Sequence, residues 1–288
     1  MSQKIGTLRL ALTFAGCFLG AGYVSGQELW QYFGAFGARG LLGLVLAVAL
    51  LGGTGVLLLR LSARTGIETM DALIVRADIP WLRTVVGVLT AVLLFGVVCI
   101  MAAGIGALGE QMLGLPVWLG AAIACVLIAA AAYFGLGGMV SVFTVAVPCM
   151  IVAALVIAGI RLHRTGLTAA AFAAGDTNPM LDLACRLGTA GVVYAVLLFL
   201  GMFGTSVSSL VAVLTYAGQK SARLAGHRTA LLLVLTAAAF AGSLFGFGDL
   251  IGTVYPVYGY LGMAAMLLVA EHAVHARRAG NHCAATGD

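Results

Sequence analysis

Residues 191–218 read GVVYAVLLFLGMFGTSVSSLVAVLTYAG and contain no charged side chain. A transmembrane helix needs about 20 apolar residues, because the hydrocarbon core is about 30 Å thick and a helix rises about 1.5 Å per residue. Residues 86–109 and 117–138 are also free of charge and long enough to cross a bilayer. These three stretches therefore predict membrane-spanning helices.

The composition of the whole chain supports the same class of protein. Hydrophobic residues make up 62% of the 288 residues and charged residues 9%, against about 25% charged in soluble domains. We therefore expect an all-α integral membrane protein. The net charge of +5 comes from basic residues beside the apolar runs, which suit lipid headgroups and topology signals better than nucleic acid. No nucleic-acid partner is expected.

Hydropathy predicts about eight spans in a single transmembrane domain over residues 1–288. They cover residues 6–36, 40–60, 84–113, 116–136, 138–160, 190–217, 229–247 and 251–271. The first apolar run lacks a clear cleavage site, so we expect it to stay in the membrane. Residues 66–80 form the main cytoplasmic connection, and residues 161–186 an external segment along the interface.

The distribution of lysine and arginine predicts the orientation of the spans. External positions are expected for Arg39, Arg161, Arg164 and Arg186. Cytoplasmic positions are expected for Lys4, Arg9, Arg60, Arg64, Arg76, Arg83, Lys220, Arg223, Arg228, Arg277 and Arg278. Both termini are therefore predicted to be cytoplasmic, in a multi-pass protein of the inner membrane.

A polar, glycine-rich break interrupts the first span, where residues 20–28 read GAGYVSGQE. An unwound segment inside the membrane exposes backbone groups, and many secondary transporters bind solute or ions there. The alternative is a small-residue face for close helix packing. We predict a solute site formed by Gly20, Gly22, Tyr23, Ser25 and Gly26.

Glu28 ends this break and is the deepest ionisable side chain expected in the membrane. Burying a carboxylate there is unfavourable by several kcal/mol, so such a group is a functional candidate by default. We predict a coupling or gating role for Glu28. The alternative is a hydrated side chain nearer the external surface.

Residues 204–209 of the sixth span read GTSVSS and place hydroxyls beside a glycine. Hydroxyl and carbonyl oxygens are hard ligands that suit an alkali cation. The alternative is that these side chains bond to their own helix. Thr205 and Ser206 are the candidate ion ligands.

Two further features favour structural roles. Residues 245–256 read FGFGDLIGTVYP, which predicts a corner between the last two spans. We expect tyrosines at the membrane interfaces, namely Tyr194, Tyr216, Tyr255, Tyr258 and Tyr260.

The chain carries no motif typical of an enzyme or of a transition-metal site. G-x-S-x-G, H-E-x-x-H and P-loop patterns are missing from the sequence, and the six cysteines show no C-x-x-C spacing. We therefore expect neither an enzyme nor a cofactor, apart from a sodium ion at Thr205 and Ser206.

Three runs together resemble the YkvI-like bacterial membrane proteins. They are residues 20–34, GAGYVSGQELWQYFG; residues 102–111, AAGIGALGEQ; and residues 252–262, GTVYPVYGYLG. That family is similar to a distant branch of the amino acid, polyamine and organocation transporters, which have the LeuT-type fold of two inverted five-helix repeats. The resemblance implies a discontinuous first helix that holds solute and ion, with Thr205 and Ser206 completing a cation site.

The chain departs from that pattern in its second half. Residues 1–162 resemble the first five-helix repeat, whereas residues 178–275 resemble only about three helices of the second. The resemblance therefore implies a reduced LeuT-type bundle and secondary transport of an amino acid or similar small solute, coupled to sodium or protons. Three alternatives remain: a reduced transporter, a homo-oligomer that completes the site across subunits, and a degenerate scaffold, sensor or partner subunit without transport.

Overall fold

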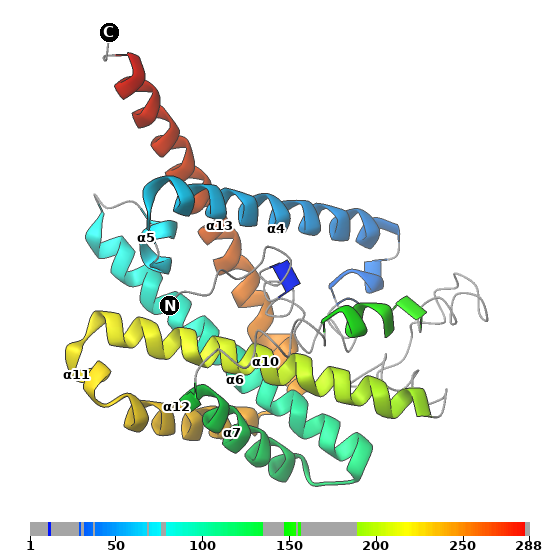
Figure 1. The fold of residues 1–288 in the computed structure, drawn as a ribbon. Coiled ribbons are helices and arrows are strands. Elements are labelled where there is room, and N and C mark those ends of the chain that lie inside the picture. Colours follow the sequence, from blue (N-terminus) through cyan, green and yellow to red (C-terminus); the bar gives the residue numbers. More distant parts are fainter. Residues whose placement is uncertain are drawn as a thin grey trace. The chain divides into compact units, whose positions relative to one another are not determined.

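The computed structural model describes residues 11–12, 29, 32–36, 38–67, 69–75, 79–134, 147–153, 155–156 and 189–285. Its elements are the 3-10 helix η1 (Gly34–Phe36) and the α-helices α4 (Ala38–Thr65), α5 (Met70–Ile74), α6 (Pro80–Leu113), α7 (Val117–Phe134), α10 (Thr189–Lys220), α11 (Ala222–Gly226), α12 (Arg228–Ser243) and α13 (Phe247–Ala285). These described residues are helical with no strand (Figure 1).

Five helices are long and apolar enough to cross a membrane. They are Arg39–Thr65, Pro80–Leu113, Val117–Phe134, Gly191–Lys220 and Phe247–His275. They match the predicted spans 40–60, 84–113, 116–136, 190–217 and 251–271. The predicted span 229–247 is the shorter apolar helix Arg228–Ser243. The predicted spans 6–36 and 138–160 lie mostly outside the described residues, and the eight-helix LeuT-type arrangement stays a prediction.

The chain forms two compact units, and the long helices α6 and α13 contribute to both. Unit 1 comprises Met1–Gly37 and Leu94–Gly252, and unit 2 comprises Ala38–Leu93 and Thr253–Asp288. The division into repeats at residues 1–162 and 178–275 stays a prediction.

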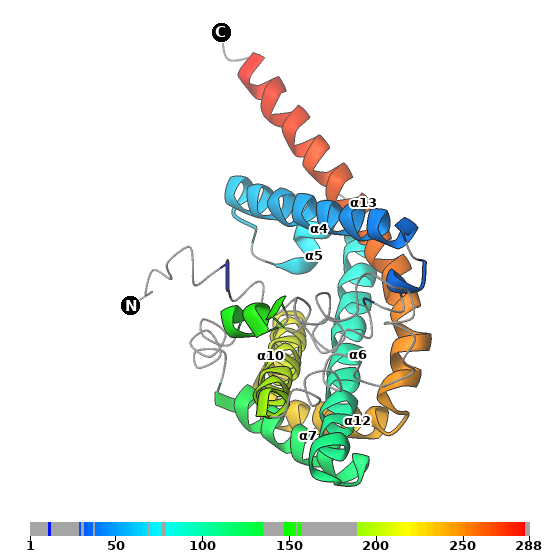
Figure 2. The same cartoon turned by 90° about the vertical axis from the view of Figure 1, so that its right-hand side faces the viewer.

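In unit 1, the second half of α6 is buried on all sides. Every residue from 98 to 106 is buried, which is more than two full turns. A helix that is apolar all round is expected to lie inside a bundle. Around it stand α7, α10 and α12, with α7 packed against both other helices (Figures 1 and 2).

Close helix packing in unit 1 depends on glycine. A Cβ atom at Gly106 would lie 2.6 Å from the backbone oxygen of Val117, and one at Gly120 would lie 3.0 Å from the Cα atom of Gly106. Helices α6 and α7 therefore touch backbone to backbone, as small residues permit in membrane proteins.

Unit 2 has its own apolar core where α5 meets α13. Ile74, Val75 and Val269 are buried there. Partly buried side chains around them come from α4, α6, α13 and the approach to α6, namely Leu57, Leu58, Ile79, Leu82, Val86, Ala265 and Leu268. The predicted connection 66–80 thus contains a docked helix, α5.

The predicted corner over residues 245–256 is wrong in its second part. The turn between α12 and α13 ends at Gly246, whose φ of +89° places it in the left-handed region that glycine adopts readily. Pro256 lies inside α13. Membrane helices tolerate an internal proline because neighbouring groups can pair with the freed backbone.

Tyr194, which is expected at a membrane interface, is buried against other helices of unit 1. Its side chain is 1% exposed and is one of the largest fully buried side chains among the described residues. Tyr194 faces the core of unit 1. The sequence did not predict this orientation, because an almost entirely apolar helix has no polar face that marks its exposed side.

Candidate functional site

The hydroxyl cluster of α10 lies inside unit 1. Thr205 is 6% exposed, Ser206 0% and Ser209 6%. Met202, Val207 and Leu210 on the same helix are also fully buried. Polar side chains are therefore concentrated at one level of a helix whose other residues are mainly apolar.

Two of the three serines in this cluster, Ser206 and Ser208, bond to their own helix. Ser206 Oγ donates a hydrogen bond of 2.8 Å to the carbonyl oxygen of Met202. Ser208 Oγ donates one of 3.0 Å to the carbonyl oxygen of Thr205. This is the structural alternative considered for the cluster. It uses the hydroxyl protons and leaves oxygen lone pairs, which are the atoms a cation requires.

Thr205 differs from its neighbours. Its Oγ1 atom is buried and has no hydrogen-bond partner within the described part of the chain. Leaving a buried hydroxyl unpaired is unfavourable by about 1–3 kcal/mol, and each such group in a native protein calls for an explanation.

Six other threonines of the described helices form a hydrogen bond to their own helix, whereas Thr205 does not. The carbonyl four residues earlier accepts a hydrogen bond of 2.7 to 3.1 Å from Thr54, Thr65, Thr84, Thr90, Thr215 and Thr236. Thr205 is on a continuous α-helix as well, yet its Oγ1 forms no such bond. The oxygen is therefore available to a group that is not part of the described structure.

The predicted solute site in the first span lies outside the described residues. This applies to Gly20, Gly22, Tyr23, Ser25, Gly26 and Glu28. Their placement beside Thr205 stays a prediction.

The residue nearest to that break with described contacts is Tyr32. Its hydroxyl donates a hydrogen bond of 2.9 Å to the carbonyl oxygen of Ile251 on α13. The next carbonyl, of Gly252, lacks its usual helical donor because residue 256 is proline. The end of the first of the three runs thus contacts the residue just before the third.

The second run meets the same region from α6. A Cβ atom at Gly104 would lie 2.9 Å from Sδ of Met202 and 3.0 Å from Cε2 of Phe247. Met202 is one turn before Thr205, and Phe247 is one turn before Ile251. Within unit 1, the end of the first run, the second run and the hydroxyl cluster are therefore linked from Tyr32 through Ile251, Phe247 and Met202 to Thr205.

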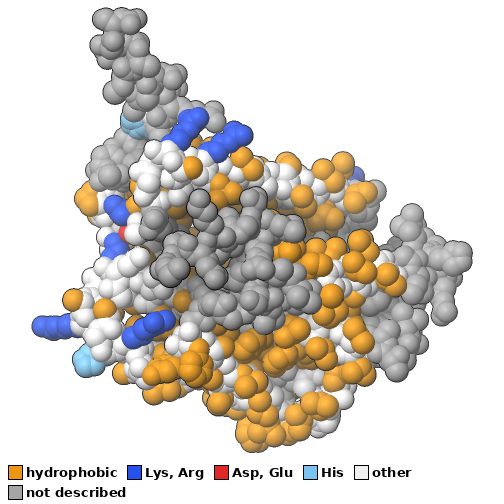
Figure 3. All heavy atoms as spheres, viewed as in Figure 1, with side chains coloured by type: hydrophobic (Ala, Val, Ile, Leu, Met, Phe, Trp, Pro, Cys, Tyr) orange, Lys and Arg blue, Asp and Glu red, His pale blue; other side chains and the backbone are white. Residues whose placement is uncertain are grey.

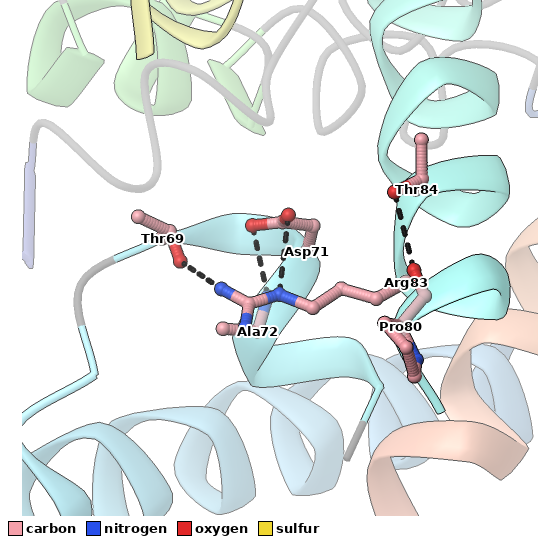
Figure 4. Close-up of polar contacts among 6 residues, drawn as sticks. All are labelled: Thr69, Asp71, Ala72, Pro80, Arg83 and Thr84. Atoms are coloured by element: carbon pink, nitrogen blue, oxygen red, sulfur yellow. Dashed lines mark hydrogen bonds and ion pairs between the residues drawn. The ribbon is translucent and has the colours of Figure 1, made fainter. Parts of the chain in front are cut away.

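Unit 2 contains an ion pair with a buried carboxylate that was not predicted from the sequence. Asp71 on α5 is 3% exposed, and its Oδ2 atom lies 3.2 Å from Nε of Arg83 on α6. Nη2 of Arg83 donates to Oγ1 of Thr69 at 3.2 Å, and the amide of Ala72 donates to Oδ1 of Asp71 at 3.0 Å (Figure 4). The spacing of Asp71 and Arg83 in the sequence did not predict the ion pair, because the end of α5 lies between them.

A second bond holds α5 from the other side. Nδ1 of His272 on α13 lies 3.0 Å from the carbonyl oxygen of Leu73 and donates to it. Helix α5 is thus tied to α6 by Arg83 and to α13 by His272. These contacts give α5 a structural role in unit 2.

Two proteins of Bacillus subtilis (strain 168) share part of this sequence. The uncharacterized protein YyaD is 29% identical over 158 residues, which are 55% of this chain and 45% of YyaD. The uncharacterized membrane protein YkvI is 26% identical over 158 residues, 54% of this chain and 46% of YkvI. The chain is a distant relative of both. It spans about half the length of these curated relatives.

The similarity to YkvI supports a relationship to YkvI-like membrane proteins. Together with five helices apolar enough to cross a bilayer, it indicates a membrane protein. No protein-family model matches the chain, and no solved structure gives a significant match.

Proposed function

We propose that the protein is a secondary active transporter of an amino acid or similar small solute, coupled to sodium or protons, in a bacterial inner membrane. The observation that carries the proposal is the buried, unpartnered hydroxyl of Thr205. An alkali cation would be co-transported and would bind Thr205 Oγ1 together with a lone pair of Ser206 Oγ. The proposal does not assign the protein any enzymatic activity.

The surroundings of Thr205 support a cation rather than a transition metal. Helix α10 supplies hydroxyl and carbonyl oxygens, which are hard ligands. In the described residues no group of three His, Cys, Asp or Glu side chains is placed to hold a metal ion. A monovalent cation is more easily released than a divalent one from a site of neutral oxygens, because the electrostatic attraction is weaker.

The first span would supply the rest of the site. Backbone groups at Gly20, Gly22 and Gly26, with Tyr23 and Ser25, would bind the solute, and Glu28 would carry a proton or order the break. The chain of contacts from Tyr32 through Ile251, Phe247 and Met202 to Thr205 supports this assignment, because Tyr32 follows the break by only four residues.

The test is the thermal stability of the purified protein in detergent, measured with a panel of amino acids, with and without sodium, at two pH values. A ligand that binds only the folded state stabilises it by about 2.7 kcal/mol at a hundredfold excess over its dissociation constant. A sodium-dependent shift for one class of solute supports sodium coupling. A shift that depends on pH alone supports proton coupling through Glu28. No shift with any solute, in folded protein, would favour the scaffold or sensor alternative.

A further inference from the structure

The connection between α10 and α12 is a nine-residue elbow, residues 220–228, with an unusual charge pattern. It contains Lys220, Arg223, His227 and Arg228. The sequence from residue 183 to residue 248 contains no acidic side chain. The two helices that the elbow joins therefore offer no acidic side chain to Arg223 or Arg228.

Acidic residues elsewhere in unit 1 are far from the elbow. Asp249 follows the opposite end of α12, whose 16 residues extend about 24 Å. Glu110 is near Gly104 on α6, which meets α10 at Met202, about 27 Å along the helix axis before Lys220. These are the acidic residues that the structure describes in unit 1.

The elbow is also exposed over most of its length. Every residue from 222 to 230 is exposed, and Figure 3 shows Lys, Arg and His side chains gathered where α11 lies in Figure 1. Helix α11 has 5 residues and buries none of them. Helix α11 contacts its neighbours α10 and α12, and its exposed side faces the surroundings of the described protein.

The position of the elbow at the end of a span indicates that lipid headgroups surround it. Lys220 ends a candidate membrane span, and its Nζ atom lies 5.7 Å from the ring centre of Tyr216. Leu224, 40% exposed, sits between the arginines. Cations around one apolar side chain at the end of a span are typical of a segment that lies among lipid headgroups.

We propose that residues 220–228 form a binding surface for anionic phospholipid, with Arg223 and Arg228 contacting headgroup phosphates and Leu224 entering the acyl-chain boundary. The surface binds lipid whether or not the protein transports a solute. Anionic lipid adds about 1 kcal/mol of attraction per arginine or lysine near the surface, which is about a fivefold change in affinity.

The experiment titrates phosphatidylglycerol into the full chain in mixed micelles with phosphatidylcholine and follows the melting temperature. The variant Arg223→Gln with Arg228→Gln is expected to lower the apparent lipid affinity by about 10- to 30-fold. The matched control is Arg60→Gln with Arg64→Gln, which removes the same charge from exposed positions on α4. Because Arg60 and Arg64 also lie at the end of an apolar run, we expect a loss of affinity smaller than that of the elbow variant.

Three outcomes would overturn the proposed lipid-binding surface. Equal losses in both double variants would show general attraction to the net positive charge and would overturn the assignment to the elbow. No stabilisation of the wild type by phosphatidylglycerol, or an equal effect of inorganic phosphate, would overturn lipid binding. Arg223→Lys with Arg228→Lys keeps both charges and should keep most of the affinity, so it remains informative if the glutamine variant fails to fold.

Discussion

The hydroxyl of Tyr32 donates a hydrogen bond to the carbonyl oxygen of Ile251, at 2.9 Å, across 219 residues of sequence. The acceptor lies one residue before Gly252, whose carbonyl loses its helical donor to Pro256. This bond ties the end of the first span to the start of α13 in unit 1. A described residue that follows the predicted solute site by a few positions is therefore held by a contact that is distant in sequence.

Tyr32→Phe removes that bond without changing the shape of the ring. We expect the free energy of unfolding to fall by about 1 kcal/mol, because the net contribution of one such bond is of that size. Thermal melting in detergent measures the change. Tyr133→Phe is the control, since the Tyr133 ring is 60% exposed and packs edge-on against Phe134. Equal losses in the two variants would contradict a specific role for the Tyr32 hydroxyl.

Gly106→Ala tests the contact between α6 and α7. The new Cβ atom would lie 2.6 Å from a backbone oxygen, which no side-chain rotation can relieve, so we expect a loss of about 1–3 kcal/mol. Gly109→Ala is the matched control on the same helix, where the nearest atom is 3.8 Å away. It should gain up to about 1 kcal/mol from helix propensity. Melting curves that rank the two variants in the opposite order would refute the close approach.

Arg83→Gln is expected to destabilise the protein by about 1–3 kcal/mol, because it removes the partly exposed guanidinium from beside the buried carboxylate of Asp71. The same change at the exposed Arg64 should alter stability by less than about 0.5 kcal/mol. The double variant Asp71→Asn with Arg83→Gln should recover part of the loss, since no buried charge remains. A double-mutant cycle from thermal melts measures this coupling, and strictly additive losses would show that the pair does not interact.

Thr205→Val replaces the unpartnered hydroxyl with a methyl group of the same size. In sodium-free buffer we expect a gain of about 1 kcal/mol in stability, because an unsatisfied buried polar atom disappears. Thr215→Val on the same helix removes a hydroxyl that already bonds to Val211, so it should give no gain. A clear loss of stability in Thr205→Val would mean that the hydroxyl has a partner in the folded protein.

The sequence predicted the five long spans well, because a bilayer demands continuous apolar runs of a fixed length. It also directed attention to Thr205, since hydroxyls beside glycine stand out in an apolar helix. It could not predict that Ser206 bonds to its own helix while Thr205 does not, because the two hydroxyls are adjacent and differ only in their surroundings.

The remaining errors have physical causes. Pro256 indicates a helix end in a soluble protein but is tolerated inside a membrane helix. The burial of Tyr194 depends on which face of α10 meets the core, and an apolar helix carries little information about its rotation. Asp71 and Arg83 are brought together by a short docked helix that hydropathy does not detect.

The most direct test of the proposed function is uptake of radiolabelled amino acids into proteoliposomes that contain the full chain, driven by an inward sodium or proton gradient. The account predicts gradient-dependent accumulation of one class of solute by the wild type and by Thr215→Val. If sodium is the coupled ion, accumulation should be lost in Thr205→Val, although that variant is folded. Absence of uptake under both gradients, or sodium-driven uptake that Thr205→Val leaves unchanged, would contradict it.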